Sequence, residues 1–308
     1  MPLVLVSSPR FVDHVTPAEH PERPERAETL EAVAARFREQ GGTVLEPRSA
    51  TDDDLARVHT REHIAAIVAT RGRATMIDED TFTSPDSDDI ARLAAGAVLT
   101  AVDHVLDGAR GSRALAMVRP PGHHAEADRA MGFCLYNNIA AGAAYARSRG
   151  LSRVAIVDFD VHHGNGTQAM FYEDPSILFV SSHQYPFWPG SGAAGETGRG
   201  AGEGFTLNVP LTIGDKDGVV ERKYAEVVLP RLREFKPELL MVSAGFDAHE
   251  QDPLGQLRMT TAGFGRLTKA LLDVADDVCE GKVVFVTEGG YDLRALSDSL
   301  DAVIAVCR

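Results

Sequence analysis

The sequence has few cysteines, a single tryptophan and no long apolar run. Its three cysteines, Cys134, Cys279 and Cys307, are an odd number without CxxC spacing, which argues against a disulfide framework and fits a reducing compartment. No apolar stretch approaches the roughly 18 residues that span a bilayer, and the opening "MPLVLVSSPR" lacks the basic region of a signal peptide. We therefore expect a cytoplasmic protein outside the membrane.

Positive charge is also scarce. The 31 lysines and arginines face 45 aspartates and glutamates, for a formal net charge of -14, which argues against a nucleic-acid partner and mildly favours cationic ones. With 44% hydrophobic residues, the chain can bury a substantial core. There is no repeat or linker, and the segment 185–204, with seven glycines, is predicted to be a long loop. We expect a single domain over 1–308.

Short apolar runs alternate with helical stretches along most of the chain. Continuous apolar runs rich in β-branched residues predict strands that are buried on both faces, over 114–118, 154–160, 176–183, 238–245 and 283–290. Helices are predicted over 24–39, 88–107, 137–149, 218–235 and 261–280. This alternation predicts an α/β fold with a largely parallel central sheet and helices on both faces.

Polar residues gather where the predicted strands end. "ALAMV" runs into "RPPGHH", "VAIVDFD" into "VHHGNGTQ", "LLMVSAG" into "FDAHEQDP" and "VVFVTE" into "GGYDL". In open parallel sheets, ligands bind outside the carboxyl ends of the strands. These four segments are therefore expected to converge on one site.

Asp160 and His162 are two residues apart, and an extended chain would put both side chains on one face. With Asp247 at another strand end they provide three ligands, the number that a catalytic zinc takes while keeping one position open. Such a zinc lowers the pKa of water and polarises a carbonyl. Helix capping is the alternative for each aspartate alone, but the combination with His162 favours a metal.

The adjacent His123 and His124 suit proton handling, because hydrolysis of an amide needs a base for water and an acid for the leaving amine. Asp158 and Asn165 are candidates to hold the second nitrogens of these imidazoles. Tyr291, after a Gly-Gly turn, could donate a hydrogen bond to an oxyanion. A purely structural role, as a buried side chain in a turn, is the commoner explanation for such a tyrosine.

The motifs "RPPGHHAE…GFCLYNN", "VDFDVHHGNGTQ", "VSAGFDAHEQDPLG" and "EGGYDL", in this order, resemble the zinc-dependent histone deacetylase family. The similarity is greatest to its class II branch and to bacterial deacetylase-like amidohydrolases. "HPERPER" at 20–26 also matches, so the resemblance extends from about residue 14 to 306. It implies an arginase/deacetylase-like α/β fold and hydrolysis of an acyl amide on lysine or a related amine.

The resemblance also implies roles for particular residues. The family's zinc ligands match Asp160, His162 and Asp247. His124 matches its general base and acid, His123 the electrostatic partner, and Tyr291 the tyrosine that polarises the carbonyl. Some weakly active members have histidine in place of this tyrosine, so Tyr291 favours activity.

A substrate tunnel is implied in the same way. Gly132 and Phe133 match its floor and wall, and Trp188 falls where the opposite aromatic wall is expected. Leu254 stands where a polyamine-selective member has glutamate, which disfavours that selectivity here. Arg26 matches an arginine that lines an internal cavity.

Two cation sites are implied less directly. Three residues resemble the family's inner potassium site together with the backbone of Asp160 and His162: Asp158, Ser181 and Ser182. Part of an outer cation site is resembled by Phe171, Asp174 and Ile177. Asn165 departs from the class I pattern, which has aspartate there. This departure is usual in class II, but it leaves His124 without a second carboxylate partner.

Three local patterns compete with this interpretation. "HTREH", 59–63, fits a metalloprotease HxxEH, but no second zinc signature supports it. "GSGAAG", 190–195, fits GxGxxG without the strand–turn–helix context that the motif needs. The acidic stretch 77–89 is interpreted as a solvated segment that precedes a helix. The alternative is that Asp80 contacts a cationic substrate.

Two other functions remain as alternatives. Dinuclear manganese ureohydrolases share the fold but need DxHxD, whereas Gly164 stands here in place of the third carboxylate. A module that binds acylated partners without cleaving them is disfavoured by the complete ligand set and Tyr291. The residues leave open whether the substrate is an acetyl-lysine peptide, an acetylated polyamine or another small amide, and whether the protein is an oligomer.

Overall fold

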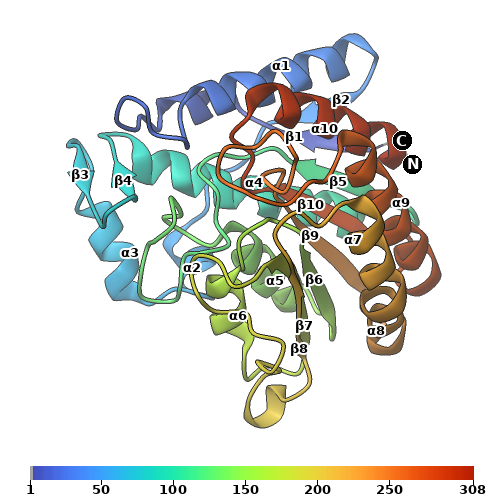
Figure 1. Ribbon diagram of the computed structural model, residues 1–308. Helices are drawn as coiled ribbons and strands as arrows, with labels where there is room; N and C mark the ends of the chain where they lie inside the picture. Colours follow the sequence, from blue (N-terminus) through green and yellow to red (C-terminus); the bar gives the residue numbers. More distant parts are fainter. Residues whose placement is uncertain (1–2) are drawn as a thin grey trace.

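The computed structural model describes residues 3–308 and is built around one large parallel sheet (Figure 1). Its eight strands lie in the spatial order β2 (Thr43–Leu45), β1 (Val4–Val6), β5 (Arg113–Ala116), β10 (Val283–Thr287), β9 (Leu239–Ala244), β6 (Val154–Asp158), β7 (Ile177–Gln184) and β8 (Thr206–Leu211). Every neighbouring pair in it is parallel. A small antiparallel pair joins β3 (Thr75–Met76) to β4 (Phe82–Thr83). The predicted largely parallel sheet is confirmed.

Helices cover both faces of this sheet (Figure 1). One face packs against α1 (Glu25–Glu39), α7 (Asp217–Lys223), α8 (Leu229–Phe235), α9 (Thr261–Val278) and α10 (Leu293–Cys307). The other packs against α4 (Ser87–Asp107) and α5 (Asn138–Ser148). Within β5, Leu115 belongs to the first core, whereas Ala114 and Ala116 belong to the second. Because both faces are buried, the middle strands are largely apolar and do not alternate, as in β6 and β10, where a polar residue stands only at the last position.

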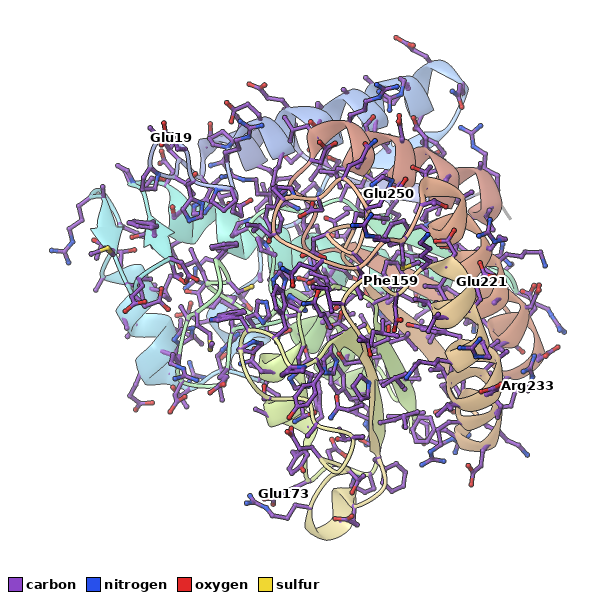
Figure 2. All side chains as sticks on the ribbon, viewed as in Figure 1. Glu19, Phe159, Glu173, Glu221, Arg233 and Glu250 are labelled. Carbon is purple, nitrogen blue, oxygen red and sulfur yellow. The ribbon has the colours of Figure 1, made fainter. Side chains whose placement is uncertain are left out.

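The remaining α-helices of the described residues are α2 (Asp52–Leu55), α3 (Arg61–Val68) and α6 (Asn165–Phe171). A third apolar cluster, which includes Leu55, Ile64 and Leu99, joins α2 and α3 to α4. Figure 2 shows the resulting contrast between an interior residue such as Phe159, which is 2% exposed, and charged side chains such as Arg233 at the periphery. Within residues 3–308, no helix is both long and apolar enough to span a membrane.

The five predicted strands and five predicted helices are all present, with small shifts at their ends. The predicted helix 218–235 is interrupted by a π-helical turn, Tyr224–Val228, between α7 and α8. The predicted loop 185–204 contains only a short 3₁₀ turn at Gly200–Gly202. The short strands β1 and β2 were not predicted from the sequence, and neither was β8. In β8, an edge strand, Pro210 and partly exposed positions interrupt the apolar run that would have indicated a buried strand. The helices α2, α3, α6 and α10 were not predicted either.

The four strands whose ends carry polar motifs are immediate neighbours. They occupy the middle of the sheet in the order β5, β10, β9 and β6. Because all four run in the same direction, their carboxyl ends meet at one edge. The topology therefore brings together segments that are up to about 170 residues apart in the chain, such as Pro120 and Tyr291.

Candidate active site

Asp160, His162 and Asp247 come together at the ends of β6 and β9. One donor atom from each lies within 4.8 Å of the other two, and His162 Nδ1 is 3.2 Å from both Asp160 Oδ1 and Asp247 Oδ2. Among residues 3–308, no other group of three or more His, Cys, Asp or Glu side chains is close enough to hold an ion. Because β6 already ends at Asp158, a bend brings Asp160 and His162 together. The extended chain on which the expected shared face of Asp160 and His162 depended is therefore not present.

The two carboxylates of this group are buried side by side, which favours a cation between them. Burial, together with the charge of Asp160, raises the pKa of Asp247 to about 7. Nearby glycines leave room for both acids: a Cβ at Gly289 would lie 2.1 Å from Asp247 Oδ2, and one at Gly245 would lie 2.0 Å from Asp160 Oδ2. One imidazole nitrogen and two carboxylate oxygens form a donor set that fits zinc.

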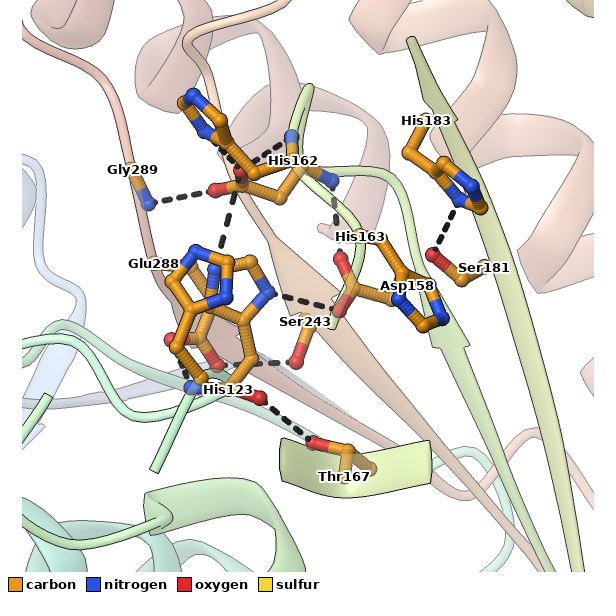
Figure 3. A network of polar contacts seen from close by, with 12 residues as sticks. His123, Asp158, His162, His163, Thr167, Ser181, His183, Ser243, Glu288 and Gly289 are labelled. Atoms are coloured by element: carbon orange, nitrogen blue, oxygen red, sulfur yellow. Dashed lines mark hydrogen bonds and ion pairs between the residues drawn. The ribbon is translucent and has the colours of Figure 1, made fainter. Parts of the chain in front are cut away.

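His123 is paired with a carboxylate in the interior. Its Nδ1 lies 2.9 Å from Asp158 Oδ2, and its Nε2 lies 3.8 Å from Asp160 Oδ1 (Figure 3). Burial opposes a charge on the ring, but Asp160 and Asp158 outweigh it and raise the pKa of His123 well above its usual value. His123 is therefore a buried imidazolium beside the candidate metal group.

His124 has the opposite environment. Its Nδ1 lies 2.8 Å from the amide oxygen of Asn165. Burial, followed by the charges of His123 and His162, lowers the pKa of His124 well below its usual value. The rings of the two adjacent histidines are only 3.9 Å apart, yet at neutral pH one is charged and the other is neutral and able to accept a proton.

Tyr291 follows the glycine turn after β10. Its backbone N–H donates to Asp252 Oδ2 at 2.7 Å, and the guanidinium of Arg26 lies 5.0 Å from its ring centroid. Arg26 is itself fully buried, and its Nε donates to the carbonyl of Gly290 at 2.7 Å. Burial raises the pKa of Tyr291 well above its usual value, so its hydroxyl stays protonated and available as a hydrogen-bond donor.

A cavity of about 210 Å³ connects these groups to the surface. It is lined by Asp80, His124, Gly132, Phe133, His162, Trp188, Leu254 and Tyr291. All four residues that sequence reasoning assigned to a tunnel therefore line one cavity. Asp80, the residue named within the acidic stretch, lines it as well.

The wall of this cavity depends on an unusual backbone. Gly132 has φ +57°, and a Cβ there would lie 2.5 Å from the Trp188 ring and 2.7 Å from the His124 ring. The next residue, Phe133, has φ +69° although it is not glycine, a conformation that costs about 1–2 kcal/mol. Trp188, 41% exposed, meets His124 edge to face at a centroid distance of 4.6 Å. A strained backbone conformation is thus present directly beside the site, as is common at functional positions.

Two further buried carboxylates that sequence reasoning did not single out organise the site. Glu288 Oε2 accepts the backbone N–H groups of Gly122 and His123 at 2.7 and 3.1 Å, and its Oε1 accepts the hydroxyl of Ser243 at 2.9 Å (Figure 3). The other carboxylate is Asp252, whose Oδ2 accepts the backbone N–H of Tyr291. The sequence did carry a signal for both residues, because each is an acidic residue within a strand-end motif: Glu288 in "EGGYDL" and Asp252 in "HEQDPLG".

The residues expected at the inner potassium site lie around Asp158. Ser182 Oγ is 3.4 Å from the Asp158 carbonyl oxygen and 2.8 Å from the Tyr224 hydroxyl. Ser181 Oγ is 2.9 Å from His183 Nδ1. All of these side chains are buried. The residues expected at the outer site lie between the end of α6 and the start of β7: Phe171, Asp174 and Ile177.

The "HTREH" histidines are engaged elsewhere. His59 Nδ1 is 3.0 Å from the Glu126 carbonyl oxygen, and its Nε2 accepts the N–H of Asn137 at 2.9 Å. His63 Nε2 is 2.9 Å from the Leu135 carbonyl oxygen. These imidazoles bind backbone groups, which supports their interpretation as structural residues. The "GSGAAG" segment likewise lies in a loop and opens no helix.

The sheet and this site together define an α/β protein of the arginase/deacetylase type. In support, the structure superposes on the crystal structure described as the HDA15 HD domain with a TM-score of 0.93, at 40% sequence identity, over 99% of this chain and 89% of that one. The sequence profile of the histone deacetylase domain matches residues 20–307.

Relatives come from plants, animals and microbes. The chain is 42% identical over 302 residues to Histone deacetylase 10, chloroplastic, of Oryza sativa subsp. japonica, covering 91% of this chain and 68% of that protein. It is 43% identical over 299 residues to Histone deacetylase 15 of Arabidopsis thaliana, covering 93% of this chain but only 52% of the relative. A probable deacetylase of Archaeoglobus fulgidus is 38% identical, with 94% and 81% covered. The chain belongs to the histone deacetylase family, and this membership supports deacetylase activity in general.

Proposed function

We propose that this protein is a zinc-dependent amidohydrolase that removes an acetyl or related acyl group from lysine or a similar amine. The main support is that a single cavity is lined by His162 of the metal group, by the neutral imidazole of His124 and by the protonated hydroxyl of Tyr291. These are a metal ligand, a base and a hydrogen-bond donor for an oxyanion, which together suit hydrolysis of an amide.

In the proposed reaction, Asp160, His162 and Asp247 hold the zinc ion. When bound, zinc supplies Lewis acidity to the acyl carbonyl and to the attacking water. His124 takes the proton of that water through Nε2, because its Nδ1 faces Asn165. Tyr291 donates a hydrogen bond to the carbonyl oxygen as this atom gains negative charge.

The tetrahedral species then loses the amine. The imidazolium of His123, fixed by Asp158, stabilises the negative charge that develops in the site. His124, now protonated, returns its proton to the leaving nitrogen as the C–N bond breaks, which gives a carboxylic acid and a free amine. Transfer of the acid proton then leaves a carboxylate and an ammonium ion. The base and the acid are therefore the same side chain at successive stages.

The lining of the cavity supports a substrate with an alkyl stem. Phe133, Trp188 and Leu254 are apolar, and Asp80 adds a carboxylate that can accept an N–H group or attract a cation. We propose an acetyl-lysine peptide as the substrate, with an acetylated polyamine or another small amide as the alternative. A module that binds acyl-lysine without cleaving it is the remaining alternative.

Further parts of the proposal concern ions and context. Buried oxygens around Asp158, Ser181 and Ser182 support a potassium ion there as a structural cofactor. We also propose that 1–308 forms one catalytic domain that acts in the cytoplasm. The name of the rice relative specifies a chloroplastic protein, so location is to be tested separately, with a fluorescent fusion of the full chain.

The direct test is steady-state hydrolysis by the zinc-loaded protein of three matched substrates: an acetyl-lysine peptide, an N-acetylated polyamine and a longer acyl-lysine peptide. We expect turnover, with kcat/KM highest for acetyl-lysine. If kcat/KM is highest for the N-acetylated polyamine, acetylated polyamines are the substrate class instead of acetyl-lysine peptides. Tight binding without turnover on any of the three, with zinc confirmed by elemental analysis, would support the binding module instead.

A further inference from the structure

His124 has an amide for a partner, and a carboxylate stands behind that amide. Asn165 Oδ1 lies 2.8 Å from His124 Nδ1, and on its other side Asn165 Nδ2 donates to Glu126 Oε1 at 2.9 Å. Glu126 Oε1 also accepts from Arg129 at 2.9 Å. The result is a chain of imidazole, amide, carboxylate and guanidinium that begins beside the metal group and ends at the surface, where the Arg129 side chain is 59% exposed.

The surroundings of Asn165 allow only one orientation of its amide. Besides Glu126 Oε1, the Nδ2 group lies 3.4 Å from both the His124 carbonyl oxygen and the sulfur of Met131. All three neighbours are acceptors. A flipped amide would set its oxygen against a carboxylate and a carbonyl, and each buried group left without a partner costs about 1–3 kcal/mol.

This orientation determines the tautomer of His124. An amide oxygen only accepts, so the nitrogen that faces it, Nδ1, must carry the proton in the neutral ring. The lone pair is then on Nε2, which is the nitrogen left free to receive a proton. If the Asn165 amide could rotate, both tautomers would be populated and part of the protein would present a protonated Nε2 instead.

We propose that Glu126 is a positioning residue for the base of the reaction: it locks the Asn165 amide and thereby holds His124 in the tautomer protonated at Nδ1. The expected effect on turnover rests on the proposed function, whereas the expected tautomer of His124 does not. It also accounts for asparagine at this position, because aspartate would place a second carboxylate about 3 Å from Glu126, and like charges that close repel.

Three variants test the role of Glu126 in turnover. Its side chain is 26% exposed, so its replacement should leave the core intact. We expect Glu126→Ala to lower kcat about 10-fold with KM almost unchanged, an effect near 1.4 kcal/mol on the barrier. Glu126→Gln, whose oxygen can still accept from Asn165, should recover most of the loss. Arg129→Ala, which removes only the outer partner, serves as the matched control and should stay near the parent rate.

A second experiment reads the tautomer without any need for activity. With ¹⁵N-histidine in the zinc-loaded protein, imidazole nitrogen shifts separate protonated from unprotonated nitrogens, and the spectrum of His124→Ala assigns the signal. We expect one tautomer of His124, protonated at Nδ1, in the parent and in Arg129→Ala, and a mixture in Glu126→Ala. A single unchanged tautomer in Glu126→Ala, with unchanged kcat, would overturn the proposal. Absence of turnover in the parent would defeat the proposed function but leave the tautomer result decisive.

The repulsion argument is tested separately. Asn165→Asp should lower kcat by 10-fold or more while Glu126 is present, and the additional change Glu126→Gln should restore much of that loss, because it removes one of the two facing charges. Equal losses with Glu126 and with Gln at this position would contradict the claim that the two residues act together.

Discussion

The Nδ1 atom of His123 lies 2.9 Å from Asp158 Oδ2, and both side chains are almost fully buried, at 3% and 0% exposure. The next residue, His124, faces the uncharged Asn165 instead. Burial lowers the pKa of His124, and the charges of His123 and His162 lower it further, whereas the carboxylates of Asp160 and Asp158 outweigh burial and raise the pKa of His123. The two imidazoles, although adjacent in the chain, therefore differ in charge at neutral pH. That difference allows one to stabilise negative charge while the other takes up a proton.

Replacement of the two histidines should have unequal effects. His124 lines the substrate cavity and His123 does not. We expect His124→Ala to lower kcat by about 10²–10⁴-fold, the usual contribution of a general base, and His123→Ala to lower it less. Steady-state kinetics with zinc content measured for each variant checks this. A larger loss in His123→Ala than in His124→Ala would reverse the proposed roles.

Removal of one hydroxyl should separate catalysis from metal binding. Tyr291→Phe keeps the ring against Arg26 and Phe133 but loses the donor to the oxyanion. We expect kcat to fall by about 10²–10³-fold, with bound zinc and the melting temperature unchanged. An unaltered kcat would show that Tyr291 plays no part in the reaction.

Metal removal should cost both activity and stability. The Asp160 and Asp247 carboxylates are fully buried within the metal group, so a chelator should lower the melting temperature and abolish turnover, and added zinc should restore both. At a free zinc concentration 100 times Kd, the stabilisation is about 2.7 kcal/mol. Asp247→Asn should weaken the response to zinc. A melting temperature of the parent that is indifferent to chelator and zinc would argue against this metal site.

A single charge in the cavity should change its selectivity. Leu254 lines the cavity together with Asp80, and a second carboxylate there would attract the extra ammonium groups of a polyamine. We expect Leu254→Glu to raise the ratio of kcat/KM for an N-acetylated polyamine to that for an acetyl-lysine peptide. Leu254→Gln, of equal length but uncharged, is the control. The same ratio in both variants would exclude an electrostatic effect.

Acid should destabilise the fold through His59. Burial, followed by the nearby His63, lowers the pKa of His59 to about 3, and protonation of Nε2 would break its bond to the Asn137 N–H. Between pH 6.5 and 3 the unfolded chain, with its ordinary pKa near 6.5, binds more protons than the folded one. This group therefore lowers the free energy of unfolding as pH falls through that window, by up to about 1.4 kcal/mol per pH unit.

Urea unfolding at pH 7.5, 6.0 and 5.0 measures this dependence. His59→Gln should be less stable at neutral pH but should lose less stability on acidification than the parent, whereas Glu62→Gln, at an exposed position of α3, should behave like the parent. If His59→Gln and the parent lose equal stability between pH 7.5 and 5.0, the titration of His59 is not responsible.

Much of the architecture could be predicted from the sequence, because the strands that carry the site residues are buried on both faces. β6, β9 and β10 present unbroken apolar runs that end in polar motifs, and parallel strands bring such ends to one edge. By contrast, β8 lies at the edge of the sheet and has partly exposed positions. Its weaker pattern gave no comparable signal.

The amino-acid sequence by itself determined the parallel α/β fold and the residues available for chemistry at the strand ends, since continuous hydrophobic burial and polar loop residues are local properties of the chain. Only the tertiary structure decided how those residues are paired. The bend that joins Asp160 to His162, the support of His123 by Glu288 and the contact of Glu126 with Asn165 depend on hydrogen bonds between side chains and segments that the fold brings together. Such contacts depend on direction and distance in space, which spacing along the chain does not encode.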